Sequence, residues 1–204
     1  LHFTHAGWFE GICLGHTSKN IDLRIRQFER ARDRERSLAL ARSMICGKIR
    51  NCRILLRRND EQIPAQALER LAEYAAQAER ASSFETLLGV EGAAAELYFS
   101  RLGCLLKADD ERLSFQGRNR RPPRDPVNAV LSYLYGILVK ECFVTLLAVG
   151  FEPYLGFYHQ PKYGRPALAL DLMEEFRPLI ADSTMVSLFN NKELDIKDFV
   201  ITEE

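Results

Sequence analysis

Residues 33–58, DRERSLALARSMICGKIRNCRILLRR, decide the fold class of this chain. Apolar residues recur there at intervals of three or four positions: Leu38, Ala41, Ile45, Ile49, Cys52 and Leu56. Because an α-helix turns once every 3.6 residues, these positions form one apolar stripe, and the arginines between them lie off the stripe. An apolar stripe has to be buried against other elements, so this stretch predicts the first long helix of a core.

The chain beyond this stretch keeps a helical pattern with clear start and stop signals. Pro64 is suited to open a second helix, and residues 82–85 (Ser-Ser-Phe-Glu) have the form of a capping box that starts a third. Asp125 and Pro126 form a cap-and-start pair for a very apolar helix that ends near Gly150.

The two ends of the chain differ from its middle. A further helix is predicted from Ala167, and Pro178 must break or kink it. We predict a mainly α protein with three parts: the strand-forming end of a truncated N-terminal region in 1–20, a basic linker in 21–32, and a C-terminal helical domain in 33–204. The chain opens in apolar sequence without Met, so we expect a fragment, truncated also at its C-terminus, or one segment of a fusion.

The distribution of charge favours a nucleic-acid partner. Residues 19–58 hold 13 basic and 4 acidic side chains, whereas residues 171–204 hold 3 basic and 9 acidic ones. Arginine outnumbers lysine by 21 to 7, and its planar guanidinium donates two parallel hydrogen bonds to phosphate. A single basic run is more often a solvated helix face, but a second arginine cluster and a separate acidic cluster weaken that interpretation.

The cysteines and the hydropathy indicate a cytoplasmic protein without a membrane partner. The five cysteines are scattered, and none forms a C-x-x-C pair, which suggests reduced thiols. Cys52 and Cys142 fall in apolar helical patterns, so we expect them in the core. No apolar run reaches the ~18 residues of a membrane span, and no secretory signal is visible.

Three stretches carry candidate metal ligands. Glu91 lies between two glycines in an alanine-rich helix, where small residues let a backbone or ligand approach, although an exposed glutamate beside a helix crossing fits as well. His159 lies in a turn-rich stretch, where a histidine bonded to backbone is the alternative. Asp171, Glu174 and Glu175 share a helix face at positions i, i+3 and i+4, which a solvated first turn would also explain.

Two or three carboxylates with one imidazole favour Mg²⁺ or Mn²⁺ over zinc or a facial iron site. Such an ion can polarise a phosphodiester, activate a 3′-hydroxyl or water, and stabilise the leaving oxygen. An arginine-rich loop would supply phosphate contacts through Arg118, Arg120, Arg121 and Arg124.

Five motifs, in order along the chain, resemble those of the CRISPR-associated integrase and endonuclease family, the "Cas-one" spacer-acquisition proteins. The resemblance covers residues 21–180, and its motifs are LRIRQF at 23–28, GVEG at 89–92, FQGRNRRPPRDPVNA at 115–129, GFYH at 156–159 and YGRPALALDLMEEFRP at 163–178.

The resemblance implies the truncated end of a small N-terminal β domain in 1–20, an interdomain linker in 21–32, and a C-terminal helical catalytic domain in 33–204 that acts as two homodimers bridged by a small "Cas-two" subunit. It implies Glu91, His159 and an acid of the last helix as metal ligands; the family pattern favours Glu174, with Asp171 supporting it. The positions that it places near the DNA path are Asn128, Tyr135, Lys162 and Arg165. Some relatives are fused to a reverse transcriptase, and a missing N-terminus is compatible with such a fusion.

We therefore predict a divalent-metal-dependent DNA integrase and endonuclease that joins the 3′-hydroxyl ends of captured DNA, the prespacer, to the leader–repeat junction of a CRISPR array by transesterification. Double-stranded and branched DNA are the expected partners. One alternative is a non-catalytic DNA-binding scaffold subunit of the adaptation complex, which needs the arginines but has no use for Glu91 and His159 together. Another is a branched-DNA repair nuclease without repeat preference.

Overall fold

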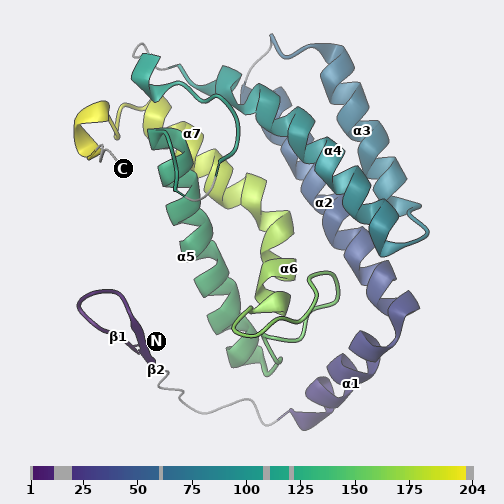
Figure 1. Ribbon diagram of the computed structural model, residues 1–204. Coiled ribbons are helices and arrows are strands. Elements are labelled where there is room, and N and C mark those ends of the chain that lie inside the picture. Colours follow the sequence, from purple (N-terminus) through teal and green to yellow (C-terminus); the bar gives the residue numbers. More distant parts are fainter. Residues whose placement is uncertain (1, 12–19, 60–61, 108–110, 120–121, 201–204) are drawn as a thin grey trace.

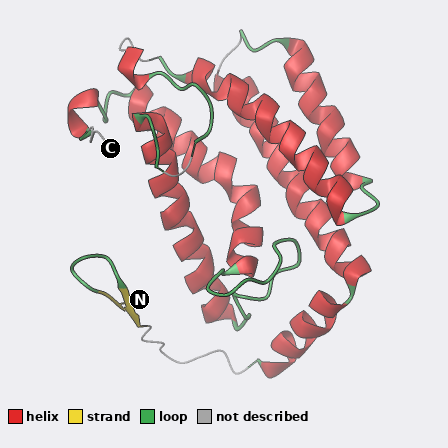
Figure 2. Cartoon of the chain, in the orientation of Figure 1, coloured by secondary structure: helices red, strands yellow, loops and turns green. Residues whose placement is uncertain are grey.

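The computed structural model describes residues 2–11, 20–59, 62–107, 111–119 and 122–200 (Figure 1). Its strands β1 (His2–Phe3) and β2 (Phe9–Gly11) form an antiparallel hairpin. From residue 20 onward the described ranges contain helices, turns and loops but no strand (Figure 2). The prediction of a mainly α chain with strands confined to residues 1–20 is therefore confirmed.

The helical part consists of α-helices, short 3₁₀ turns and a π-helical segment, η3. In chain order its elements are α1 (Ile21–Arg32), α2 (Arg34–Asn59), α3 (Ala65–Glu79), α4 (Phe84–Leu102), η1 (Gly103–Leu105), η2 (Glu111–Leu113), α5 (Pro126–Val149), α6 (Ala167–Phe176), η3 (Arg177–Asp182), α7 (Ser183–Asn190) and η4 (Ile196–Asp198).

Helix α2 is the centre of the larger hydrophobic core. Its predicted stripe is buried as expected, with Ala41, Ile45 and Leu56 fully shielded from solvent. The stripe packs against α3 and α4, and α6 lies against α2 on another side (Figure 1). Cys52 lies in this core, and Cys142 lies in a second apolar cluster between α5 and α6, which confirms both as packing residues.

Helix α6 joins the two halves of the helical body. It packs on α2 from one side and on α5 from the other. In Figure 1 the layer of α2, α3 and α4 lies on the right, and α5 with α7 on the left. Residues on α6 can therefore meet side chains from both halves, which is what a site assembled from distant motifs requires.

Most predicted helix boundaries agree with the structure. Pro64 precedes α3, Asp125 caps α5 with Pro126 in its first turn, and Gly150 ends α5 in a left-handed conformation. The cap of α4 is Ser83, which accepts the amide of Thr86, one residue later than the predicted capping box.

The predicted linker, residues 21–32, is a helix rather than an extended segment. Asn20 caps α1 by accepting the amide of Leu23, and this start signal was overlooked among the charged residues. The buried amide of Gln27 donates to the backbone carbonyls of Glu152 and Leu155. Helix α1 is thus attached to the loop that precedes α6. The division of the chain into domains stays a prediction.

Pro178 interrupts the last long helix, as predicted. Its ring has no N–H to donate, so the regular ladder of α6 ends at Phe176. The chain continues through the π-helical segment η3 into α7 without leaving a helical path. Wider π turns are often found at functional sites. Here the turn carries Asp182 into the core, where its side chain is 1% exposed.

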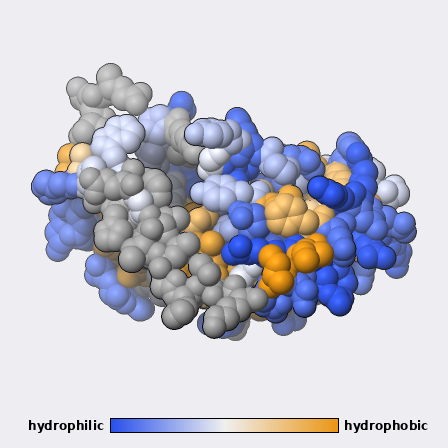
Figure 3. Space-filling view, turned by 90° about the horizontal axis from the view of Figure 1, so that it is seen from below, coloured by the Kyte–Doolittle hydropathy of each residue, from blue (hydrophilic) through white to orange (hydrophobic). Residues whose placement is uncertain are grey.

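Helix α5 is long and apolar enough to cross a membrane by length and composition alone, with a mean hydropathy of 1.6 over its most apolar window, of which 33% is buried. It packs here as a core helix, because Val127, Leu131 and Leu138 are buried against neighbouring helices. The ion pair of Lys140 and Glu141 lies near its middle. The described face shown in Figure 3 is largely hydrophilic with a small apolar group.

Candidate active site

Three helices bring charged side chains to one point. Helix α4 supplies Glu91, α6 supplies Glu174, and α2 supplies Lys48. The Lys48 ammonium forms ion pairs with Glu91 Oε1 and, at 2.6 Å, with Glu174 Oε2. The side chain of Glu174 is 3% exposed and that of Glu91 is 17% exposed. Two acids that are 83 positions apart in the sequence therefore face the same buried cation.

Loop residues 156–159 add the imidazole of His159 to this cluster. His159 Nε2 lies 4.0 Å from Glu174 Oε1, and its Nδ1 lies 2.7 Å from Asp171 Oδ1. Because Asp171 is a carboxylate acceptor, the favourable tautomer has Nδ1 donating to it and the lone pair of Nε2 facing the site. The structure thus brings together Glu91, His159 and Glu174, the three predicted metal ligands.

Asp171 has a different environment from Glu174. It is fully buried, and its two oxygens accept the backbone amides of Phe157, Tyr158 and His159 as well as the His159 ring. All of its hydrogen-bonding capacity is directed at the loop. Asp171 therefore positions the histidine and is not available to a metal in this arrangement.

Gly156 makes this wrapping possible. A Cβ atom at this position would lie 2.7 Å from Asp171 Oδ2 and 2.9 Å from atoms of Ala167. No side chain fits in so short a distance, so the loop can close on the aspartate only with glycine at its start. Local geometry thus explains the first residue of the GFYH motif.

Two further side chains hold the carboxylates of the site. The Tyr158 hydroxyl donates to Glu91 Oε2, and Arg177 Nη1 lies 3.2 Å from Glu174 Oε1. Burial raises the pKa of Tyr158, and the negative charge of Glu91 raises it further. Burial opposes the charged form of Lys48, but the carboxylates of Glu174 and Glu91 outweigh it and raise its pKa. Lys48 is therefore a charged ammonium at neutral pH.

The same contacts act in the opposite direction on Glu91. Burial opposes its charged form, yet the Lys48 ammonium and the Tyr158 hydrogen bond hold its pKa below the ordinary value. Glu91 is therefore ionised at neutral pH, as a ligand of a divalent cation has to be.

The donor set fits a hard divalent cation. Two carboxylates and one imidazole are an oxygen-rich set of ligands. The buried oxygen Glu174 Oε2 lies 2.6 Å from the Lys48 ammonium. Among the described residues no three acidic, histidine or cysteine side chains stand close enough to form a metal cluster. Lys48 lies between the two glutamates, and this separates them.

Glu175 lies outside the cluster. It is exposed on α6, its backbone oxygen accepts from Asn51, and its carboxylate lies against Gly47 of α2. A Cβ at position 47 would approach Glu175 Oε1 to 2.8 Å. The third candidate acid therefore packs on the neighbouring helix.

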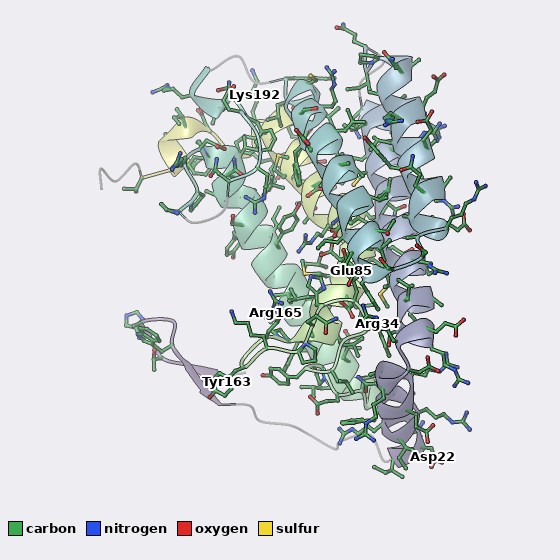
Figure 4. The ribbon with its side chains drawn as sticks, turned by 45° about the vertical axis from the view of Figure 1, so that its right-hand side comes forward. Asp22, Arg34, Glu85, Tyr163, Arg165 and Lys192 are labelled. Carbon is green, nitrogen blue, oxygen red and sulfur yellow. The ribbon has the colours of Figure 1, made fainter. Side chains whose placement is uncertain are left out.

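A cleft of about 630 Å³ leads to the site. Glu91 and His159 are among its lining residues, together with the cations of Arg32, Arg34 and Arg165. Figure 4 shows Arg34 and Arg165 on either side of this region, with Glu85 close to Arg34. Arg34 forms an exposed ion pair with Glu85 at 3.1 Å. The cleft thus combines basic side chains with an acidic inner end.

The arginine loop is partly a structural element. Arg118 donates to Asn128 Oδ1 at 2.7 Å and to Ser132 at 3.1 Å, and its guanidinium lies over the ring of Tyr135. Arg124 is exposed. The predictions for Arg120 and Arg121 fall outside the described residues.

Asn128 and Tyr135 point inward. Asn128 is fully buried and bonded to Gly117, Arg118 and Asp125, while the Tyr135 hydroxyl donates to Asp182 at 2.6 Å. A buried amide cannot reach DNA, so the expected contact at Asn128 becomes a supporting role for the loop. Lys162 and Arg165 are exposed, as a DNA contact requires.

Sequence patterns did not reveal Lys48, Tyr158, Arg177 or Arg34 as members of the site. Lys48 directly precedes the stripe residue Ile49, so it reads as one of many cations beside an apolar face. The signal available was its position after Gly47, where two helices approach closely.

This helical architecture with its carboxylate–imidazole cluster matches a family of CRISPR-associated proteins. A family model described as "CRISPR associated protein Cas1" matches residues 1–204. The chain belongs to the Cas1 family.

Named relatives agree with this assignment. A CRISPR-associated exonuclease Cas4/endonuclease Cas1 fusion from Geobacter sulfurreducens is 48% identical over 206 residues, covering 97% of this chain and 37% of the relative. CRISPR-associated endonuclease Cas1 3 from Thermus thermophilus is 48% identical over 182 residues, covering 89% and 53%. The chain thus spans between about a third and about half of the length of these relatives.

Solved structures share the fold. A Cas1 protein from Thermotoga maritima superposes with a TM-score of 0.77 at 27% identity, covering 90% of this chain and 58% of the other. A partial Cas6-RT-Cas1–Cas2 complex gives 0.82 at 29% identity, with 91% and 55% covered. A casposase bound to an integration product gives 0.81 at 26% identity, with 94% and 53% covered.

Proposed function

We propose that this chain is the catalytic helical domain of a Cas1 integrase and endonuclease, which joins the 3′-hydroxyl ends of captured DNA to the leader–repeat junction of a CRISPR array. The observation that carries the proposal is the meeting of Glu91, His159 and Glu174 beside a basic cleft. Similarity to a casposase bound to an integration product supports the same chemistry.

The three side chains are a suitable set of ligands for Mg²⁺ or Mn²⁺. Such an ion, when bound, supplies Lewis-acid stabilisation of the charge that develops on the phosphodiester oxygens. Asp171 keeps the His159 ring in one tautomer and one orientation, and Tyr158 holds Glu91 in place. Arg34 and Arg165 are placed to hold DNA phosphates at the cleft.

The reaction is a balanced exchange of phosphodiester bonds. The 3′-oxygen of the captured strand forms a new bond to phosphorus as the bond to the 3′-oxygen of the array strand breaks. The attacking hydroxyl loses its proton, and the leaving oxygen gains one. Water in place of the 3′-hydroxyl gives hydrolysis, which is the endonuclease activity of the same site.

The assembly of the whole protein is part of this proposal. Solved relatives include Cas6-RT-Cas1–Cas2 complexes, which supports a Cas2 partner, and we propose that two homodimers of the whole protein are bridged by it. A fused reverse transcriptase is compatible with the same comparison, and a Cas4 fusion with the curated relatives. Prespacer and repeat DNA lie in the cytoplasm, where we expect the protein to act.

Glu91→Ala and His159→Ala test this function in the full-length protein with its small partner. Both variants are expected to abolish joining of labelled DNA to a leader–repeat substrate while DNA affinity stays close to that of the wild type, because the site acts on the transition state. Glu96→Ala, an exposed change on α4, is the matched control.

Two outcomes would favour the alternatives. Equal loss of binding and joining in a folded Glu91→Ala variant would support a non-catalytic scaffold. Equal rates on leader–repeat DNA and on unrelated branched DNA would support a repair nuclease.

A further inference from the structure

Lys48 occupies the position between the two glutamates that a metal would need. Its Nζ contacts Glu91 Oε1 and Glu174 Oε2, and the side chain is only 12% exposed. A divalent cation binds carboxylate oxygens at about 2.0–2.6 Å. An ammonium and a divalent ion that share the same two oxygens would lie a few ångströms apart and repel each other strongly. Lys48 and a metal therefore compete for these glutamates.

The charge balance of the site supports competition. Three carboxylates, of Glu91, Asp171 and Glu174, face the cations of Lys48 and Arg177. The formal charge of these five side chains is −1 with Lys48 in place, so a divalent ion bound beside Lys48 would reverse its sign. Lys48 stabilises the metal-free site and makes it a weaker ligand for a metal.

The structure also contains a cavity that the Lys48 side chain can enter. A cavity of about 70 Å³ lies next to the site, and its lining includes Lys48, Tyr98, Tyr135 and Asp182. Its lining is mostly apolar, with Glu91, Arg177 and Asp182 as its other charged groups, and it has room for a few atoms of a flexible side chain. Asp182 is buried, and it accepts the hydroxyls of Tyr98 at 2.7 Å and Tyr135 at 2.6 Å. His159 is not among the lining residues of this cavity.

We propose that Lys48 is the counter-ion of the Glu91–Glu174 pair in the metal-free protein, and that it turns into this cavity toward Asp182 when a divalent cation binds. This rests on the proposed function, because it takes the two glutamates and His159 as the metal ligands. Lys48 then sets the metal affinity of the site, without itself being a ligand.

Calorimetric titration with Mn²⁺ tests the competition. Lys48→Met should bind Mn²⁺ at least about tenfold more tightly than the wild type, because one positive charge beside the site is gone. The metal-free variant should melt at a lower temperature, because two buried carboxylates lose their partner, and Mn²⁺ should restore it. Lys48→Arg keeps the charge on a group too large for the cavity, so it should bind Mn²⁺ more weakly than the wild type. Arg50→Met, an exposed change on α2, is the control.

Asp182→Asn tests the destination of Lys48. The variant should weaken Mn²⁺ binding when Lys48 is present and leave it unchanged in the Lys48→Met background. Equal weakening in both backgrounds would overturn the cavity as the receiving site.

The outcomes separate this inference from the function itself. In one outcome, Glu91→Ala and His159→Ala abolish Mn²⁺ binding, but Lys48→Met leaves it unchanged or weakens it. This outcome overturns the proposed role of Lys48 and leaves the proposed metal site standing. A wild-type protein that binds no Mn²⁺ overturns the metal site and this inference together.

Discussion

Asp171 and Glu174 lie about one helical turn apart on α6, yet their carboxylates have different hydrogen-bond partners. Both carboxylate oxygens of Asp171 accept hydrogen bonds from the loop of His159, whereas one oxygen of Glu174 faces Lys48 and the candidate metal position. Spacing along α6 could not separate the two roles, because positions i and i+3 share a face. The environment of each carboxylate separates them.

Metal affinity should follow this difference. We expect Glu174→Ala to lose Mn²⁺ binding, because it removes a ligand, and Asp171→Ala to weaken it by about 10–100-fold through the released histidine. Mn²⁺ titration of both variants measures the effect, with melting curves to establish that each is folded. Loss of binding at Asp171 with little change at Glu174 would reverse the assignment.

Asp182 should make stability depend on pH. Burial raises its pKa above the ordinary 3.8, although the bonds from Tyr135 and Tyr98 and the charges of Arg177 and Lys48 oppose the shift. The folded state therefore holds this proton more tightly than the unfolded chain. Its contribution to stability is greatest below pH 3.8 and falls as the pH rises above it.

Asp182→Asn removes this titration. Urea unfolding at a series of pH values should show the stability difference moving in favour of the variant as the pH rises from about 4 toward 7. Glu96→Gln, an exposed change, should show no such trend. A constant difference between Asp182→Asn and the wild type would contradict the buried, proton-binding carboxyl.

At the scale of elements, the N-terminus of α5 organises the arginine loop. Asn128 accepts from Arg118 and from the amide of Asn119, and it donates to Gly117 and Asp125. Its burial means that these loop groups depend on one side chain. The sequence places Asn128 in a DNA-binding motif, and the fold explains how it can serve that motif from the interior.

Asn128→Ala should therefore mainly lower the stability of the fold and should not remove a direct DNA contact. We expect a loss of about 1–3 kcal/mol of unfolding free energy, because buried partners are left unsatisfied. Arg124→Ala, at an exposed position of the same loop, should leave stability within about 0.5 kcal/mol of the wild type. Urea denaturation measures both. Equal stability of Asn128→Ala and wild type would argue that the loop holds itself together.

Some helices could be predicted from their sequence signals, and others could not. The stripe of α2 and the caps at Pro64 and Asp125 predicted their helices, since burial and capping there act within a few residues. Helix α1 is hard to predict because half of its residues are charged and its start signal is a single N-cap residue, Asn20. Pro178 predicted a break, and the structure shows that the chain continues there as the π-helical segment η3.

At the scale of the whole molecule, the exposed cations among the predicted DNA contacts should dominate DNA affinity. Arg124, Lys162 and Arg165 are exposed, whereas Arg118 is engaged within the protein. Each phosphate contact that is lost should lower the salt slope of binding by about 0.9. A triple alanine variant should therefore lose up to about 3 units of slope on branched DNA of any sequence.

Fluorescence anisotropy across a range of salt concentrations measures this slope. Arg70→Ala, an exposed cation of α3 paired with Glu73, is the control. An unchanged slope in the triple variant would place the DNA path elsewhere on the surface.

Motifs predicted the acids and the histidine of the site from residues far apart in the chain. The cations that complete it were not predictable in this way. Lys48 and Arg177 can be recognised as site residues only when α2, α6 and η3 are packed together, because the sequence does not show which cations of a helix are buried. Ion pairs between residues that are far apart in the chain are seen in the folded structure and not in the spacing of residues along the sequence.

The wrapping of Asp171 has a consequence for motion. Residues 156–159 have no regular secondary structure, but three consecutive amides, from Phe157 to His159, are fixed to one buried carboxylate. To swing outward, the segment would have to leave a buried charge without its donors, which is costly. This loop is therefore a rigid wall and not a lid. Under the proposed function, the imidazole of His159 is already in position before DNA binds.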